Sequence, residues 1–278
     1  MLAPIVIALL ALGVLSAVLL LRKRVATVQP AITEYWVYLP GDSMPTQDAL
    51  FDRVIKEDTL SLGRPPAGRE EGLLFSDVRL HLGLVLRAKN PHVFRPDLFE
   101  AHVEPTAEIL EGLSHAKSLV KIRYASEQTL PDERHLRLLP FLAEAVAAIG
   151  QGSVVFDVTA ERLMTLDELR GDLVKAGVGN VLPEQHVRAI WAPSPSGGRA
   201  CTRGLVKMGL PELRTRDVAT DEKVLALYLV ESAATEIWRR RTLPDELEIE
   251  AYGDLFRLQF FPARRGPVET AILRVQRS

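Results

Sequence analysis

The stretch RACTRGLVKMGLPELRTRDV, residues 199–218, carries the signals from which we predict the fold. Its first part, residues 200–208, alternates as a strand does, and Gly209 and Pro211 predict a turn after it. The following segment, TDEKVLALYLVESAATEIWRRR, is the strongest helix signal in the chain, with Thr220 as its expected N-cap. The apolar run at residues 224–230 predicts that this helix is buried on most sides. A strand, a turn and a long helix in this order predict a helix packed on a sheet.

Further strand and helix signals lie on both sides of this stretch. DVRLHLGLVLRAKN, residues 77–90, alternates between apolar and polar positions, and ELEIEAYGDLFRLQFF predicts a hairpin on a Gly-Asp turn. Thr165 and Glu168 have the spacing of a capping box. Pro140 predicts a kink or a restart in a helix whose expected C-cap is Gly150. We expect an α+β fold in which an N-terminal transmembrane helix precedes a mixed, largely antiparallel sheet with packed helices.

Two segments share a strand–helix–strand layout, which makes a duplication one alternative. The first runs from IRYAS to VVFDV and the second from GLVKM to LEIEAY. The two related halves would be residues 34–185 and 186–278. Periodicity alone does not decide between this alternative and a single undivided domain.

The composition is that of an ordinary globular protein. The chain has 278 residues, of which 47% are hydrophobic and 25% are charged. A net charge of −2 is too small to indicate a nucleic-acid-binding protein. The single cysteine, Cys201, excludes a disulfide within the chain and any site built from several cysteines.

The amino terminus predicts a membrane anchor. Residues 2–21 carry no charge, and a helix of this length spans roughly 30 Å, the thickness of a bilayer core. Arg22, Lys23 and Arg24 follow, and the positive-inside rule places them on the cytoplasmic side. We expect an anchor with its basic stop at residues 1–24, a short linker at 25–33 and a cytoplasmic α+β domain at 34–278. The predicted location is a bacterial inner membrane, with the bilayer contacting residues 2–21.

The chemistry-bearing residues do not form a recognisable catalytic pattern. Cys201 lacks the arginine that follows the nucleophile of cysteine-dependent phosphatases, because Lys207 stands at that position. Asp157 ends a predicted strand and His135 lies near a helix start, where such residues also serve as caps. The sequence EAHVE, residues 100–104, places two glutamates and a histidine on one face but is more typical of a solvated surface. We predict no catalytic residue, no metal site and no cofactor.

A basic face is the candidate binding site. Residues 186–278 hold 15 basic and 12 acidic side chains, and the opening stretch is rich in arginine. Such a face, close to a membrane, would suit an anionic partner or lipid headgroups. A solvated strand face with no partner is the alternative. The candidate binding residues are Arg199, Arg203, Lys207, Arg214 and Arg216.

Gly204, Gly209, Pro211 and Glu212 carry a resemblance to a family. Residues 200–261 resemble uncharacterised bacterial domains that have a G-[LM]-x-x-x-G-x-P-E-[LI] core before a helix. The resemblance implies a bacterial domain of unassigned function and transfers no catalytic residue.

These patterns favour a binding or assembly domain of a bacterial inner-membrane complex rather than an enzyme. The expected partner is a protein that docks on the sheet edges or on the basic C-terminal portion. Nucleic acid is not expected, and a homo-oligomer is compatible with the sequence. An enzyme of unrecognised type, such as a hydrolase, and a membrane-surface sensor of an anionic ligand remain as alternatives.

Overall fold

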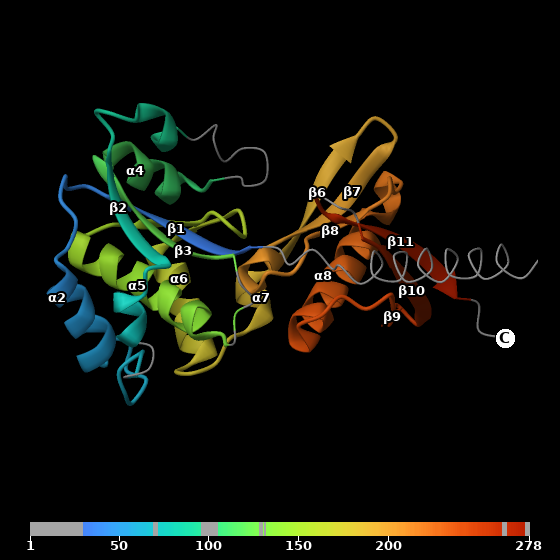
Figure 1. The fold of residues 1–278 in the computed structure, drawn as a ribbon. Coiled ribbons are helices and arrows are strands. Elements are labelled where there is room, and N and C mark those ends of the chain that lie inside the picture. The colour runs from blue at the N-terminus through green and yellow to red at the C-terminus, as the bar shows by residue number, and fades with distance from the viewer. Residues whose placement is uncertain are drawn as a thin grey trace, which may run out of the picture.

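The computed structural model of the chain describes residues 30–68, 72–95, 105–127, 130, 132–262 and 266–275. These residues form an α+β fold with two sheets, one in each half of Figure 1. The predicted fold class is wrong in its sheet, because the described residues build two sheets instead of one. Within the described ranges, no helix has the length and apolar character needed to cross a membrane. Residues 2–21, for which the membrane helix was predicted, lie outside the described ranges.

The first sheet is entirely antiparallel and is built around its middle strand. Its order is β2 (Leu80–Leu86), β3 (Ser118–Ser126), β1 (Ala31–Leu39), β4 (Val154–Asp157) and β5 (Arg162–Thr165). β1 begins inside the expected linker, and one of its faces is fully buried, whereas the other is half-buried up to the buried Tyr38. Tyr35 and Val37 pack with α5 (Arg134–Gly150), whereas Tyr38 packs with α4 (Ala107–His115) on the other face.

The helix α5 is continuous through Pro140, which is buried, so the helix does not restart there. Gly150 is its last residue, and the cap position expected at Gly150 falls on Gln151. Gln151 has the left-handed conformation that ends the helix, with a φ of 55°. Gly150 and Gly152 instead allow a close approach, because a Cβ at either position would lie 2.8 Å from a methyl group of Leu39. The short elements around this sheet are α2 (Gln47–Phe51), η1 (Asp52–Lys56), η2 (Leu73–Ser76), η3 (Pro91–Phe94) and α6 (Leu166–Ala176).

The second sheet contains one parallel pair. Its order is β6 (Arg188–Ser194), β7 (Gly197–Arg203), β8 (Leu213–Thr215), β11 (Val268–Val275), β10 (Asp254–Phe261) and β9 (Glu246–Ala251). β8 and β11 run parallel, and every other neighbouring pair is antiparallel. β8 is connected to β9 through η6 (Thr220–Glu222) and α8 (Lys223–Arg240). This connection places β9 at the far edge, and the last strand, β11, lies between β8 and β10 in the middle of the sheet.

The helix α8 covers one face of this sheet. Leu229, Ala233 and Ile237 are fully buried against the strand residues Leu213 and Leu258. The expected burial on most sides is wrong, because Val224 is 67% exposed and Tyr228 is 44% exposed. The helix therefore buries a stripe, as a helix on the surface of a sheet does.

The two sheets adjoin where the chain passes through α7 (Pro183–His186). Each contains a strand–helix–strand connection, β3–α5–β4 in the first sheet and β8–α8–β9 in the second. One strand lies between the connected strands in the first sheet, and two lie between them in the second. The duplication of halves 34–185 and 186–278 stays a prediction.

Three local predictions are corrected by one or a few residues. The strand expected at residues 200–208 ends at Arg203, and η5 (Leu205–Met208) is a 3₁₀ helix. The β9–β10 turn uses Tyr252 and Gly253, both with positive φ, rather than a Gly-Asp pair. Thr220 begins η6 and makes no capping hydrogen bond to α8.

The capping box at Thr165 is confirmed, and it gives a matched pair of variants. The Thr165 hydroxyl accepts a hydrogen bond from the Glu168 amide at 3.2 Å, and the Glu168 carboxylate accepts one from the Thr165 amide at 2.7 Å. We expect Thr165→Ala to lower the free energy of unfolding by about 1 kcal/mol. Thr220→Ala is the control, because its side chain caps no helix. Urea unfolding measures both, and equal losses would contradict the assignment.

Candidate functional site

The motif in the opening stretch forms a turn that is held by one carboxylate. Glu212 accepts hydrogen bonds from the Thr202 hydroxyl at 2.6 Å, the Gly204 amide at 2.8 Å and the Val206 amide at 3.2 Å. Gly204 has a φ of +112°, and a Cβ there would lie 1.9 Å from the carbonyl oxygen of His186. The glycine and glutamate of this motif therefore have structural roles.

Lys207 projects from this turn into the first sheet. Its ammonium lies 2.5 Å from the Asp157 carboxylate at the end of β4 and 5.5 Å from the centre of the Tyr35 ring on β1. Lys207 is 0% exposed and Asp157 1%. Burial lowers the pKa of Lys207, whereas burial first and Asp157 second raise the pKa of Tyr35. The prediction that Lys207 belongs to a surface face is therefore wrong, because this side chain joins the two sheets.

Two histidines border this buried pair. His135 places Nε2 3.0 Å from the Lys207 carbonyl oxygen and stacks on Tyr124. His186 stacks on Trp238. Burial lowers the pKa of His135 to about 4, and burial also lowers the pKa of His186 well below its ordinary value. Both rings are therefore neutral at pH 7.

The candidate acid, base and nucleophile do not meet in an accessible cleft. Asp157 is bound to Lys207, and both are enclosed by the two sheets. Cys201 lies on β7, where burial raises the pKa of its thiol and so disfavours the thiolate. The histidine and glutamates of residues 100–104 lie outside the described residues.

The other four predicted residues share one face of the second sheet. Along β7 and β8, Ala200, Thr202, Leu213 and Thr215 are buried at 0–2% exposure, on the side of α8. Because side chains alternate along a strand, the arginines between and beside them point to the opposite face. Those arginines are Arg199, Arg203, Arg214 and Arg216.

Three of these four arginines are ion-paired. Arg199 binds Asp217 at 2.6 Å, Arg203 binds Glu161 at 2.5 Å and Arg216 binds Glu269 at 2.5 Å. Arg214 has no acidic partner among the described residues. Ligand binding by this basic face stays a prediction.

The same face carries acidic and apolar groups farther along the sheet. We call it the open face, and α8 covers only the opposite side. Leu273 and Phe261 are 46% and 45% exposed in its middle. Besides the four arginines, the open face comprises Glu269, Ala271 and Leu273 of β11, Leu255, Arg257, Gln259 and Phe261 of β10, and Glu246, Glu248 and Glu250 of β9.

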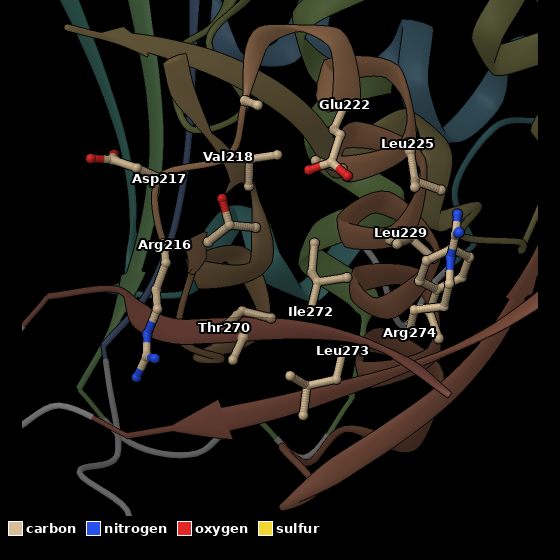
Figure 2. Close-up of a pocket in the computed structure, with 15 residues that line it drawn as sticks. Arg216, Asp217, Val218, Glu222, Leu225, Leu229, Thr270, Ile272, Leu273 and Arg274 are labelled. Atoms are coloured by element: carbon tan, nitrogen blue, oxygen red, sulfur yellow. The ribbon is translucent and has the colours of Figure 1, made fainter. Parts of the chain in front are cut away.

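A cavity of about 440 Å³ opens where β8 leaves β11. The pairing of these strands stops at Thr215 and Thr270, and the chain turns away toward η6. Figure 2 shows the hollow between Val218 and Ile272, with Leu225 and Leu229 of α8 lining it. Arg216, Asp217, Glu222 and Arg274 are the charged lining residues.

The backbone edge beside this cavity is unpaired. The Val268 amide donates to the Glu212 carbonyl, on the β8 side of β11. Alternate residues of a strand direct their backbone groups to the same edge, so those of Ile272 and Arg274 also point toward the cavity. β8 no longer faces them there, which leaves this length of β11 without a strand partner on that edge among the described residues.

No family model, no curated protein and no solved structure matches the chain. The resemblance of residues 200–261 to uncharacterised bacterial domains therefore stays a prediction. Function has to be inferred from the geometry of the described residues.

Sequence reasoning missed two parts of this arrangement. Alternation placed Lys207 on a strand face, and nothing in the local pattern indicates that Asp157 is its partner. The three glutamates of β9 had a visible signal in the sequence, because ELEIEAY alternates glutamate with apolar residues. Glu246, Glu248 and Glu250 were assigned to a strand but were not considered as a surface.

The buried pair predicts strong coupling between Lys207 and Asp157. Lys207→Met leaves an unpaired carboxylate, so we expect the free energy of unfolding to fall by about 3–5 kcal/mol. Asp157→Asn in the same chain removes the uncompensated charge and should recover part of that loss. Denaturant unfolding of both single variants and the double variant measures the coupling. Strictly additive losses would contradict a direct interaction.

His135 predicts a loss of stability in mild acid. Its pKa is about 4 in the folded chain, and the ordinary value for an unfolded chain is about 6.5. Between these values the unfolded state binds more protons, so stability falls as the pH drops from 6.5 toward 4. Protonation of His135 can lower the free energy of unfolding by at most about 3 kcal/mol. His135→Gln should flatten the dependence of unfolding free energy on pH, and an unchanged slope would contradict it.

Proposed function

We propose that the chain is a binding or assembly domain whose docking surface is the open face of the second sheet. The observation that carries this proposal is a sheet face that holds charged and half-exposed apolar side chains, next to a strand edge where a cavity opens toward α8. A face that is merely solvated needs only polar side chains. Leu273 and Phe261, each nearly half exposed, are the kind of residue that a partner buries.

The alternatives have less support from the same residues. An enzyme needs an accessible group that can transfer a proton or attack a substrate, and Asp157 and Lys207 are enclosed. A sensor of anions would use the arginines at the cavity, but Arg216 is bound to Glu269 and Arg274 to Asp254. The expected position at a bacterial inner membrane depends on residues 1–24, outside the described ranges, and stays a prediction.

Site-specific photo-crosslinking tests the docking surface in the cell that makes the protein. A photoreactive amino acid at Leu273, on the open face, should give a discrete protein adduct on irradiation. The same substitution at Val174 is the matched control, because this residue is 52% exposed on α6 beside the first sheet.

The contrast between the two positions decides the result. An adduct at position 273 and none at 174 supports the proposal. Equal adducts at both positions, or none at either, would contradict the open face as a docking surface. The adduct does not have to be identified for this comparison.

A further inference from the structure

We propose that β11 binds an extended peptide segment of a partner protein as an added strand, with an apolar side chain in the cavity and a basic side chain beside Glu222. This inference rests on the proposed function, because it names the chemistry that the partner presents next to the open face. Two separate features carry it, a strand edge without a partner and an apolar hollow directly beside that edge.

The free length of β11 begins after Thr270, where its pairing with β8 stops. On the other edge this length stays paired with β10 up to Val275. The backbone groups of Ile272 and Arg274 point to the free edge, where no strand of the described residues pairs with them. An edge of this kind is a template for another extended chain. A peptide beside it can make four backbone hydrogen bonds, two with amides and two with carbonyls.

The cavity beside this edge has room for a large apolar side chain. Val218, Leu225, Leu229 and Ile272 contribute apolar side chains to its wall (Figure 2). Its volume of about 440 Å³ lies in the range of roughly 300–1,000 Å³ that ligand pockets have. Recognition of an added strand combines backbone hydrogen bonds with a pocket for alternate side chains, and both parts are present here.

An added strand would connect the cavity with the open face. Successive side chains of a strand point to opposite faces of the sheet. Those on the side of α8 enter the cavity, because Thr270 and Ile272 of β11 face that side. The side chains between them lie on the open face beside Leu273, which is 46% exposed. One peptide therefore covers the cavity and part of the open face together.

Glu222 determines the charge that the peptide should carry. The other charged lining residues, Arg216, Asp217 and Arg274, are each ion-paired with a residue of this chain. Glu222 forms no ion pair within the described ranges, and Figure 2 shows its carboxylate directed toward the hollow. A lysine or arginine of the peptide can pair with this carboxylate, whereas an acidic peptide would be repelled by it.

Other occupants fit these features less well. A small apolar molecule could fill the cavity, but it would leave the backbone groups of Ile272 and Arg274 unpaired. A free anion would meet the unpaired carboxylate of Glu222. An extended basic and apolar peptide satisfies the edge, the cavity and the carboxylate at once.

A phage-displayed library of random octapeptides supplies the probe. Selection on the purified full chain in a nonionic detergent should enrich peptides that combine an apolar residue with a lysine or arginine. Hydrogen exchange of the chain is then measured with and without one enriched peptide. We expect exchange at the Ile272 amide to slow at least tenfold when the peptide binds. Exchange at the Leu273 amide should change little, because Leu273 already pairs with Arg257 of β10.

Charge reversal tests the place of Glu222. Glu222→Lys should weaken binding of the enriched peptide about tenfold. Asp221→Lys is the matched control, because it changes the net charge equally at a neighbouring residue that does not line the cavity, and it should leave binding nearly unchanged. A peptide with glutamate in place of its basic residue should regain binding to Glu222→Lys. Equal losses in the two variants would contradict the pairing with Glu222.

The exchange data also decide between occupants. A library without a binder, or a bound peptide that leaves exchange at Ile272 unchanged, overturns the added strand. Slow exchange at Ile272 before any peptide is added overturns it as well. If dilution removes that protection, the occupant is a second copy of the chain, and if dilution does not, the occupant is a segment of the same chain.

Crosslinking at position 273 separates this inference from the proposed function. An adduct there without peptide protection at Ile272 supports the open face as a docking surface and excludes the added strand. Protection at Ile272 without an adduct supports the added strand and contradicts the open face. The absence of both overturns both proposals.

Discussion

The ion pair between Lys207 and Asp157 is the interaction on which the arrangement of the two sheets depends. It connects a 3₁₀ turn of the second sheet to the end of β4 in the first, with both groups removed from water. Two charges buried together are tolerated only when their geometry is good and the surrounding polar atoms are paired. Three residues around the pair meet these demands. The Glu212 carboxylate holds the turn, the His135 ring makes a hydrogen bond with the Lys207 carbonyl oxygen, and Gly204 permits the close approach to His186.

This constraint separates the roles of residues that are neighbours in the sequence. Lys207 lies four residues after Arg203, yet one is enclosed between the sheets and the other pairs with Glu161 at the surface. The turn after β7 redirects the chain between them. The same stretch therefore connects the two sheets through Lys207 and contributes arginines to the proposed docking surface.

Much of the fold could be predicted from local patterns, but the sheet count could not. The capping box at Thr165 and the strand β2 follow from spacing alone. Periodicity does not say which strands pair, so one sheet and two sheets are equally compatible with it. For the candidate site, alternation placed four arginines on one face, whereas the burial of Lys207 depends on Asp157, a residue distant in sequence. Long-range pairing of this kind leaves no local signal.

The central position of β11 has a consequence for biosynthesis. Val268 pairs with Leu213 on one side, and the rest of the strand pairs with β10 on the other. During translation β11 leaves the ribosome after all the other strands of its sheet. Until then β8, which lies next to β11 in the finished sheet, has no strand partner on that side. Pairing between such distant segments forms slowly, because a long loop has to close first. Until then the nascent chain exposes two incomplete edges, and this interval is when a chaperone or a neighbouring nascent chain has most access to them.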